Sequence, residues 1–337
     1  MAMSAEERFV RVAAIDIGTV TTRLLIADVF VQDTARVLIE EVCRDLRITH
    51  LGRGIDASGQ LSHEGMRAVF EALSEYDHLI KHFQVDDVLC VATSAVRDAS
   101  NAEQLSAAAA KLGLEIEIIP GQIEAQLSFM GAIYDGAESS KQSSNLNSNL
   151  NLVVDIGGGS TELVLGRLDA QGRAEIIKLD SLQVGSRRLT DMFIDSDPPH
   201  KVELKMLRNY LQKLCSFDLR KYVGEFDCLT ATAGTATTLA AVMGKIDPYS
   251  PKEIQGYKVS RADLDELLQL FVSKKLEQRQ KIRGLDPRRA DVIVAGTLIM
   301  EGIMDALDCK EFFASDRDLL YGIILSATKS ALSRRAS

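Results

Sequence analysis

The hydrophobic pattern alternates between short apolar runs and longer amphipathic stretches, which is typical of an α/β protein. Two apolar runs differ from the others because each leads into an acid, then glycine, then hydroxyl residues: residues 12–29 read VAAIDIGTVTTRLLIADV, and residues 152–165 read LVVDIGGGSTELVL. Each predicts a strand, a tight turn and a second strand. Glycine lets such a turn reach positive φ and approach a ligand, and its successive N–H groups can form an anion site. An ordinary glycine-rich hairpin is the structural alternative.

The same order of residues, about half a chain apart, predicts two similar domains that face one cleft. Further apolar runs predict strands at residues 36–42, 88–92, 115–119, 174–182, 228–231 and 312–314. Helices are predicted at residues 61–83, 102–112, 121–134, 185–193, 201–214, 260–273, 276–284, 292–307 and 316–331. Residues 45–59 are predicted to form a loop at the cleft, and the Ser- and Asn-rich residues 137–151 a flexible loop. We therefore predict one domain at 1–133, joined by a terminal helix at 316–337, and a second at 134–315.

A Ser/Thr/Arg cluster follows the predicted strand at residues 88–92. Open α/β sheets bind ligands past the C-terminal ends of their strands, and Arg97 there could fork onto phosphate oxygens. A structural role is an equally good interpretation from spacing alone, with Arg97 paired to Asp98 or Glu103 on the next helix.

Two predicted helix N-termini also carry candidate residues. Gly234 and Thr235 lie in the small-residue turn TAGTATTL, which directly follows a strand and suits a phosphate or a nucleoside. Close helix packing would explain the same small residues. Glu124 lies in the first turn of another helix, where the helix dipole favours a carboxylate in any case.

Composition narrows the class of protein. The chain has 337 residues, long enough for two domains with cores of their own, and a net charge of −9. An acidic chain is not a generic nucleic-acid binder, so an anionic substrate would need a locally basic cleft. The five cysteines are scattered without a CxxC pair, which indicates reduced thiols rather than disulfides or a zinc site. With no signal peptide and no membrane-spanning apolar run in the sequence, we expect a cytoplasmic protein without a membrane or nucleic-acid partner.

The two acids of the second hairpin lead us to expect a metal ion. Asp155 and Glu162 cannot bind phosphate directly at neutral pH, but they can bind it through Mg²⁺, which takes carboxylate on one side and phosphate oxygen on the other. The paired hairpins resemble those of the actin, hexokinase and heat-shock ATPase superfamily. There, each half contributes one phosphate loop and one Asp.

The whole chain resembles the exopolyphosphatase and guanosine pentaphosphate phosphohydrolase (Ppx/GppA) family in its short form. The matching segments are AIDIGTVTTRLLIADV, VATSAVRDASN, IIPGQIEAQLSFMGA, VVDIGGGSTELVLG, SLQVGSRRL, ATAGTATTLAAV and GLDPRRADVIVAGTLIM, in the family's order. The resemblance implies two ribonuclease H-like (actin-like ATPase) domains on either side of a cleft. It also implies release of terminal orthophosphate from polyphosphate, or of the 5′ γ-phosphate from pppGpp of the stringent response, with Mg²⁺ or Mn²⁺.

The resemblance assigns roles residue by residue. Glu124 matches the presumed catalytic glutamate, and Glu162 matches a water-positioning acid that, with Asp155 and Asp16, also contacts metal. The phosphate-binding residues would be Asp16, Gly18, Thr19, Thr21, Arg97, Gly157, Gly158, Gly159, Ser160 and Thr161, and the turn at Gly234 and Thr235 supports them.

Four positions depart from the family pattern. Ile123 replaces the first of two adjacent glutamates, Val20 replaces an Asn, Arg53 replaces a Glu in R-L-G-E-G, and Tyr321 follows Leu320 where the family has L-R-E-G. These changes leave open the chain-length preference and the phosphate contacts of the first hairpin. The choice between polyphosphate and pppGpp is also open, and a homodimer is compatible with the sequence. A phosphotransferase and a non-catalytic polyphosphate or (p)ppGpp binder are the alternatives from other function classes.

Overall fold

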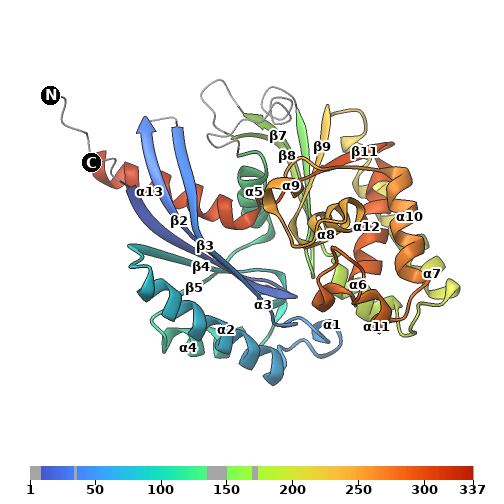
Figure 1. Ribbon diagram of the computed structural model, residues 1–337, viewed down its shortest axis with the longest axis horizontal. Coiled ribbons are helices and arrows are strands. Elements are labelled where there is room, and N and C mark those ends of the chain that lie inside the picture. Colours follow the sequence, from blue (N-terminus) through green and yellow to red (C-terminus); the bar gives the residue numbers. More distant parts are fainter. Residues whose placement is uncertain (1–8, 34–35, 135–149, 169–173, 337) are drawn as a thin grey trace.

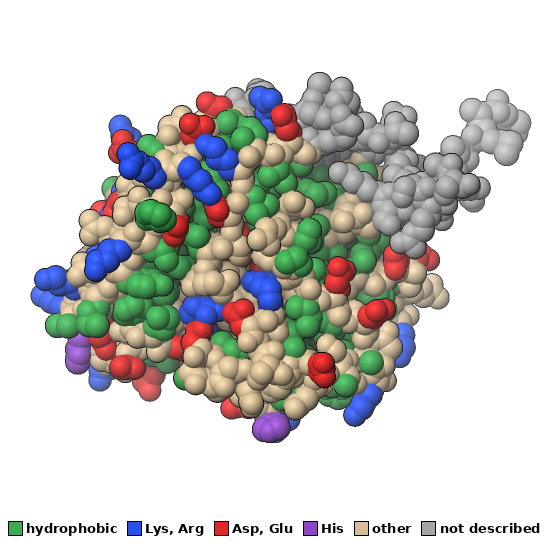
Figure 2. Space-filling model, turned by 180° about the vertical axis from the view of Figure 1, so that it is seen from behind, with side chains coloured by type: hydrophobic (Ala, Val, Ile, Leu, Met, Phe, Trp, Pro, Cys, Tyr) green, Lys and Arg blue, Asp and Glu red, His purple; other side chains and the backbone are tan. Residues whose placement is uncertain are grey.

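The structure, a computed structural model, describes residues 9–33, 36–134, 150–168 and 174–336. Two lobes, each built on one β-sheet, lie side by side, and helices cover the sheets (Figure 1). On the opposite side of the molecule, Lys and Arg side chains are interspersed with Asp and Glu rather than gathered in one basic patch (Figure 2). No helix in the described ranges is long and apolar enough to cross a membrane.

The N-terminal lobe is defined here as residues 9–118. Its strands are β1 (Phe9–Ile17), β2 (Thr21–Asp33), β3 (Arg36–Ile48), β4 (Asp87–Ala92) and β5 (Ile116–Ile118), in the sheet order β3-β2-β1-β4-β5. The first three strands form an antiparallel meander, and β4 and β5 continue in parallel. The helices are α1 (Ile55–Ser58), α2 (His63–His82), α3 (Ser94–Asp98) and α4 (Ala102–Ala110). The apolar stripe of α2 packs on one face of this sheet, and the Ser62 side chain caps the helix by accepting from the Gly65 N–H.

The C-terminal lobe, residues 150–314, repeats that topology. Its strands are β6 (Asn151–Ile156), β7 (Thr161–Leu168), β8 (Ala174–Leu182), β9 (Cys228–Thr232), β10 (Lys258–Ser260) and β11 (Glu311–Ala314), in the order β10-β11-β9-β6-β7-β8. The antiparallel meander β6-β7-β8 with parallel β9 and β11 corresponds to β1-β2-β3 with β4 and β5. The helices are α6 (Ser186–Phe193), α7 (Lys201–Asp218), α8 (Ala233–Gly244), α9 (Pro251–Ile254), α10 (Arg261–Val272), α11 (Leu276–Arg279) and α12 (Ile293–Ala306), with 3₁₀ turns at Arg220–Tyr222 and Pro287–Arg289. This repeat confirms the predicted pair of similar α/β domains.

Two helices join the lobes. α5 (Gly121–Ala132) buries Ala125 and Phe129 against the second sheet, and α13 (Leu319–Ala336) packs on the first sheet. The two helices also contact each other closely, because a Cβ placed on Gly131 would lie 1.9 Å from the Asp318 carbonyl oxygen. The domain boundary at residue 133 stays a prediction, and most of the loop predicted at 137–151 lies outside the described residues.

Several sequence predictions were wrong in extent, among them those for β3 and for the helix at 276–284. β3 continues to Ile48, so the first part of the loop predicted at 45–59 is strand, because β3 keeps pairing with β2 as far as Thr21 opposite Ile48. The charged helix predicted at 276–284 ends at Arg279. The side chain of Arg279 is buried and donates hydrogen bonds to the carbonyls of Ala290 and Lys274.

Candidate active site

The turns of the two predicted phosphate hairpins meet between the lobes. In the first, the Gly18 N–H donates to the Thr21 carbonyl at 2.8 Å, and in the second the Gly157 N–H donates to the Ser160 carbonyl at 3.0 Å. The turns are in contact, since a Cβ on Gly158 would lie 2.6 Å from Val20 Cγ2 and one on Gly159 would lie 2.7 Å from Thr19 Oγ1. Only glycine permits this approach, so the three-glycine run allows the two hairpins to close on one cavity.

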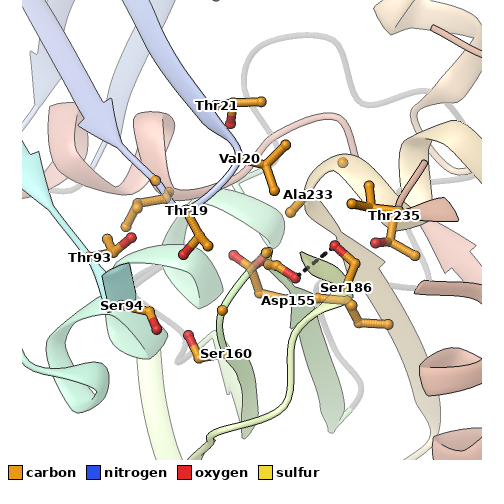
Figure 3. A pocket seen from close by; sticks show the side chains of 18 of the residues that line it. Thr19, Val20, Thr21, Thr93, Ser94, Asp155, Ser160, Ser186, Ala233 and Thr235 are labelled. Atoms are coloured by element: carbon orange, nitrogen blue, oxygen red, sulfur yellow. Dashed lines mark hydrogen bonds between the residues drawn. The ribbon is translucent and has the colours of Figure 1, made fainter. Parts of the chain in front are cut away.

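The cavity between the turns has a volume of about 70 Å³. A single water requires roughly 10–15 Å³ on the same kind of measure, so the cavity has room for a group of several atoms. Figure 3 shows hydroxyl and carboxyl side chains from both lobes around it, among them Thr19, Ser94, Asp155, Ser160 and Thr235. Most of the predicted site residues line the cavity: Asp16, Gly18, Thr19, Thr21, Glu124, Asp155, Gly157, Gly158, Gly159, Ser160, Gly234 and Thr235.

Three predicted residues do not line the cavity. Thr161 is buried below the turn, where its hydroxyl donates to the Val184 carbonyl at 2.5 Å. Glu162 is buried beside Asp155, its partner in the β6–β7 ladder. Arg97 pairs with neither Asp98 nor Glu103, the two acids that its structural interpretation named. The side chains of Thr161, Glu162 and Arg97 therefore lie outside the cavity wall and can only support the residues that form it.

Glu124 combines burial with a specific cationic partner. Its side chain lines the cavity, and Arg97 Nη1 lies 3.0 Å from Glu124 Oε2 and 2.9 Å from the Ile119 carbonyl oxygen. Burial raises the pKa of Glu124 to about 8, against the opposing effect of Arg97 and with a smaller contribution from the Asp155 charge. A carboxylate that only stabilised the helix dipole would not need to line a cavity. The geometry therefore favours a chemical role for Glu124.

Hydroxyl groups hold the two acids of the second hairpin. Ser128 Oγ donates to Asp155 Oδ2 at 2.6 Å, and Ser181 Oγ donates to Glu162 Oε1 at 2.9 Å. Burial raises the pKa of Asp155 to about 6, and burial together with the Glu124 and Asp155 charges raises the pKa of Glu162 well above its usual range. Such a concentration of buried carboxyl groups favours a cation in the site.

The donor set fits a hard divalent cation. Asp16 accepts from Arg23 through Oδ2, whereas its Oδ1 is buried and has no hydrogen-bond partner. Asp16 and Asp155 both line the cavity and offer carboxylate oxygens, the ligands that Mg²⁺ prefers. Across the described ranges, no three His, Cys, Asp or Glu side chains form a ready ligand group. The protein would thus supply one or two carboxylates, and phosphate oxygens and water the remaining ligands, as is usual for Mg²⁺.

Sequence reasoning missed Arg289. This residue lines the cavity, and among the described residues its guanidinium has neither a hydrogen-bond nor an ion-pair partner. A Cβ on Gly234 would lie 1.2 Å from Arg289 Nη1, so the glycine that was assigned to phosphate makes room for the arginine. Burial lowers the pKa of Arg289 from its ordinary value, yet a guanidinium stays charged. The DPRRAD stretch showed two arginines, but nothing local indicated that the second would enter the cleft.

Comparison with known proteins gives consistent results over nearly the full chain. The profile of the Ppx/GppA phosphatase family matches residues 30–331. Exopolyphosphatase 2 of Mycobacterium tuberculosis is 35% identical over 327 residues, covering 94% of this chain and 98% of that protein.

Solved structures agree with the sequence comparison. The Ppx/GppA family member from Aquifex aeolicus aligns with a TM-score of 0.76 at 30% identity, covering 96% of this chain and 99% of that one. An exopolyphosphatase from Cytophaga hutchinsonii aligns with a TM-score of 0.81 at 26% identity, covering 95% and 98%. The expected two-domain actin-like ATPase fold is thereby confirmed, and the chain belongs to the Ppx/GppA phosphatase family.

Proposed function

We propose that this protein is a phosphohydrolase that releases terminal orthophosphate from inorganic polyphosphate. The observation that carries the proposal is the position of Glu124, a buried carboxyl of raised pKa on the wall of the cavity that both phosphate turns line. Related proteins named exopolyphosphatase cover nearly the whole chain and support polyphosphate as the substrate class. Phosphate release from polyphosphate by the purified protein tests the proposal directly.

The residues present suit this chemistry. Phosphoryl transfer depends mainly on positioning and on stabilising charge on the non-bridging oxygens. The N–H groups of Gly158 and Gly159 donate to no acceptor within the described residues, and the Ser160 hydroxyl lines the same cavity. These donors and the Arg289 cation would hold the terminal phosphate, while Glu124 orients a water and accepts its proton. Asp16 and Asp155 would hold Mg²⁺, which supplies charge neutralisation when bound.

The reaction is expected to require Mg²⁺ or Mn²⁺. Asp16 and Asp155 offer hard oxygen ligands, and carboxylates so close together repel phosphate unless a cation intervenes. Phosphate release should stop in excess EDTA and return on addition of Mg²⁺. Asp155→Asn should lower kcat and raise the Mg²⁺ concentration needed for half-maximal rate. Full turnover in EDTA would contradict the metal assignment.

Turnover is expected to rise with pH through about 8. Burial raises the pKa of Glu124 to about 8, so below that pH the group is mainly the neutral acid. Only the carboxylate can accept a proton from water, and its population grows as pH increases. The pH profile of kcat/KM for polyphosphate measures this limb. Its persistence in Glu124→Gln would assign the titration to another group.

A larger neighbouring cavity favours pppGpp as a second candidate substrate. It has a volume of about 1010 Å³ and shares Arg23, Ala233, Gly234, Thr238 and Arg289 with the phosphate cavity. Its walls combine apolar and aromatic side chains such as Ile282 and Tyr249 with cations such as Lys281, a mixture that suits a nucleoside carrying further phosphates. Parallel phosphate-release assays on short polyphosphate, long polyphosphate and pppGpp would rank the substrates. An absolute dependence on ADP would instead indicate a phosphotransferase.

A further inference from the structure

Arg188 joins the two lobes at the phosphate turns. It lies on α6 of the C-terminal lobe, and its side chain is only 13% exposed. Its guanidinium forms an ion pair with Asp56 and donates to Asp98 Oδ2 at 2.6 Å, to Ser94 Oγ at 3.5 Å, to Gln183 Oε1 at 3.2 Å and, through Nε, to the Gly159 carbonyl at 2.8 Å. One cation therefore touches the turn of the second hairpin and two acids of the N-terminal lobe.

We propose that Arg188 is a positioning residue that holds the second phosphate turn against the N-terminal lobe and keeps the cleft closed. The inference rests on the proposed function for its catalytic consequence, but its structural part stands on these contacts alone. Only a planar guanidinium can reach a carbonyl and two carboxylates on different elements at once, and a lysine ammonium could not hold the same geometry.

The neighbouring contacts act in the same direction. Arg187 Nη2 lies 3.4 Å from His50 Nδ1, and the Gly54 N–H donates to Asp191 Oδ2 at 3.3 Å. Arg53 lies 3.6 Å from Asp291. Each of these pairs joins the loop after β3 to the C-terminal lobe. Arg188 is thus the member of this interlobe contact that reaches the second phosphate turn itself, through the Gly159 carbonyl.

The position of the phosphate cavity between the lobes gives the contact its function. With the two turns touching, the cavity of about 70 Å³ is lined by residues of both lobes, so its shape depends on how closely the lobes approach each other. Asp56 and Asp98 retain 34% and 31% exposure, and ion pairs exposed to this degree are weak enough to break and re-form. Opening the cleft would break both ion pairs of Arg188. Closing it would return the Gly159 carbonyl and the second phosphate turn to their position against the N-terminal lobe.

The test uses Asp56→Asn with Asp98→Asn, which removes both carboxylates and leaves the phosphate turn intact. Asp265→Asn is the matched control, since it breaks an ion pair with Arg261 inside the C-terminal lobe. Amide hydrogen exchange without substrate should become about fivefold faster at residues 93–98 and 157–160 in the double variant only. Circular dichroism and Tm establish that all variants are folded. If the double variant is not folded, Arg188→Lys replaces it in the test, with an increase in exchange rate expected to lie between those of the wild-type protein and the double variant.

Kinetics supply the second readout. Weaker closure should raise KM for polyphosphate by about fivefold and lower kcat less, since Glu124 and the metal ligands are unchanged. Equal exchange at both turns in the double variant and the wild-type protein would overturn the proposal. Failure of the proposed function would look different, because the wild-type protein would then release no phosphate from polyphosphate while the exchange difference remained.

Discussion

Glu124→Gln is expected to lower kcat by at least about 100-fold, because loss of a general base typically costs about 10²–10⁴-fold in rate. The amide is nearly isosteric with the acid, yet it cannot accept a proton from water. In the proposed mechanism the substrate contacts come from the turns and from Arg289, so KM should change little. Steady-state kinetics on polyphosphate, with Tm measured in parallel, check the result.

A matched control tests the alternative explanation, in which Glu124 only stabilises the helix dipole. Glu64 lies in the first turn of α2, is exposed, and shares only the helix-dipole contribution. Glu64→Gln should cost at most about 1 kcal/mol of stability and leave turnover unchanged. If Glu124→Gln behaved in the same way, the water would have to be activated by Glu162 or by the substrate itself, and the assignment of the base would fail.

The two hairpin turns could be predicted because their signals are local. An apolar run, an acid, glycines and hydroxyls determine a hairpin within about a dozen residues, and the repeat of that pattern placed both turns at one cleft. Asp16 and Asp155 then follow, because each is the second-last residue of the strand, β1 or β6, that leads into its turn. Glu124 required more, since its local pattern fitted a helix dipole equally well and its burial depends on packing between the lobes.

The arginines could not be placed in this way. Arg97, Arg188 and Arg289 each act through partners or spaces that are distant in sequence, and an arginine in a helix or turn gives no local sign of its direction. The same limit applies to the extent of β3, whose last residues, Asp45, Leu46, Arg47 and Ile48, continue the strand by pairing with β2. Long-range pairing and glycine-dependent spaces are decided by the assembled fold rather than by local propensity.

Gly131→Ala is expected to destabilise the protein by about 2 kcal/mol or more, in the upper part of the roughly 1–3 kcal/mol that overpacking usually costs. The added Cβ would lie 1.9 Å from the Asp318 carbonyl oxygen and 3.1 Å from the Gly322 nitrogen, and both are backbone atoms that cannot rotate away. Relief would require α5 and α13 to separate. Because Asp318 pairs with Arg23, which also holds Asp16, turnover should fall together with stability.

Gly302→Ala provides the control for that substitution. It also lies within a helix, α12, but its Cβ would meet only side chains, with Leu211 Cβ nearest at 3.3 Å. Alanine stabilises a helix interior by roughly 0.5–1 kcal/mol relative to glycine, so this variant should be neutral or slightly more stable. Urea unfolding measures both variants. Equal free energies of unfolding for Gly131→Ala and the wild-type protein would show that α5 and α13 can separate at no cost, and that their backbone contact does not fix the position of Asp318.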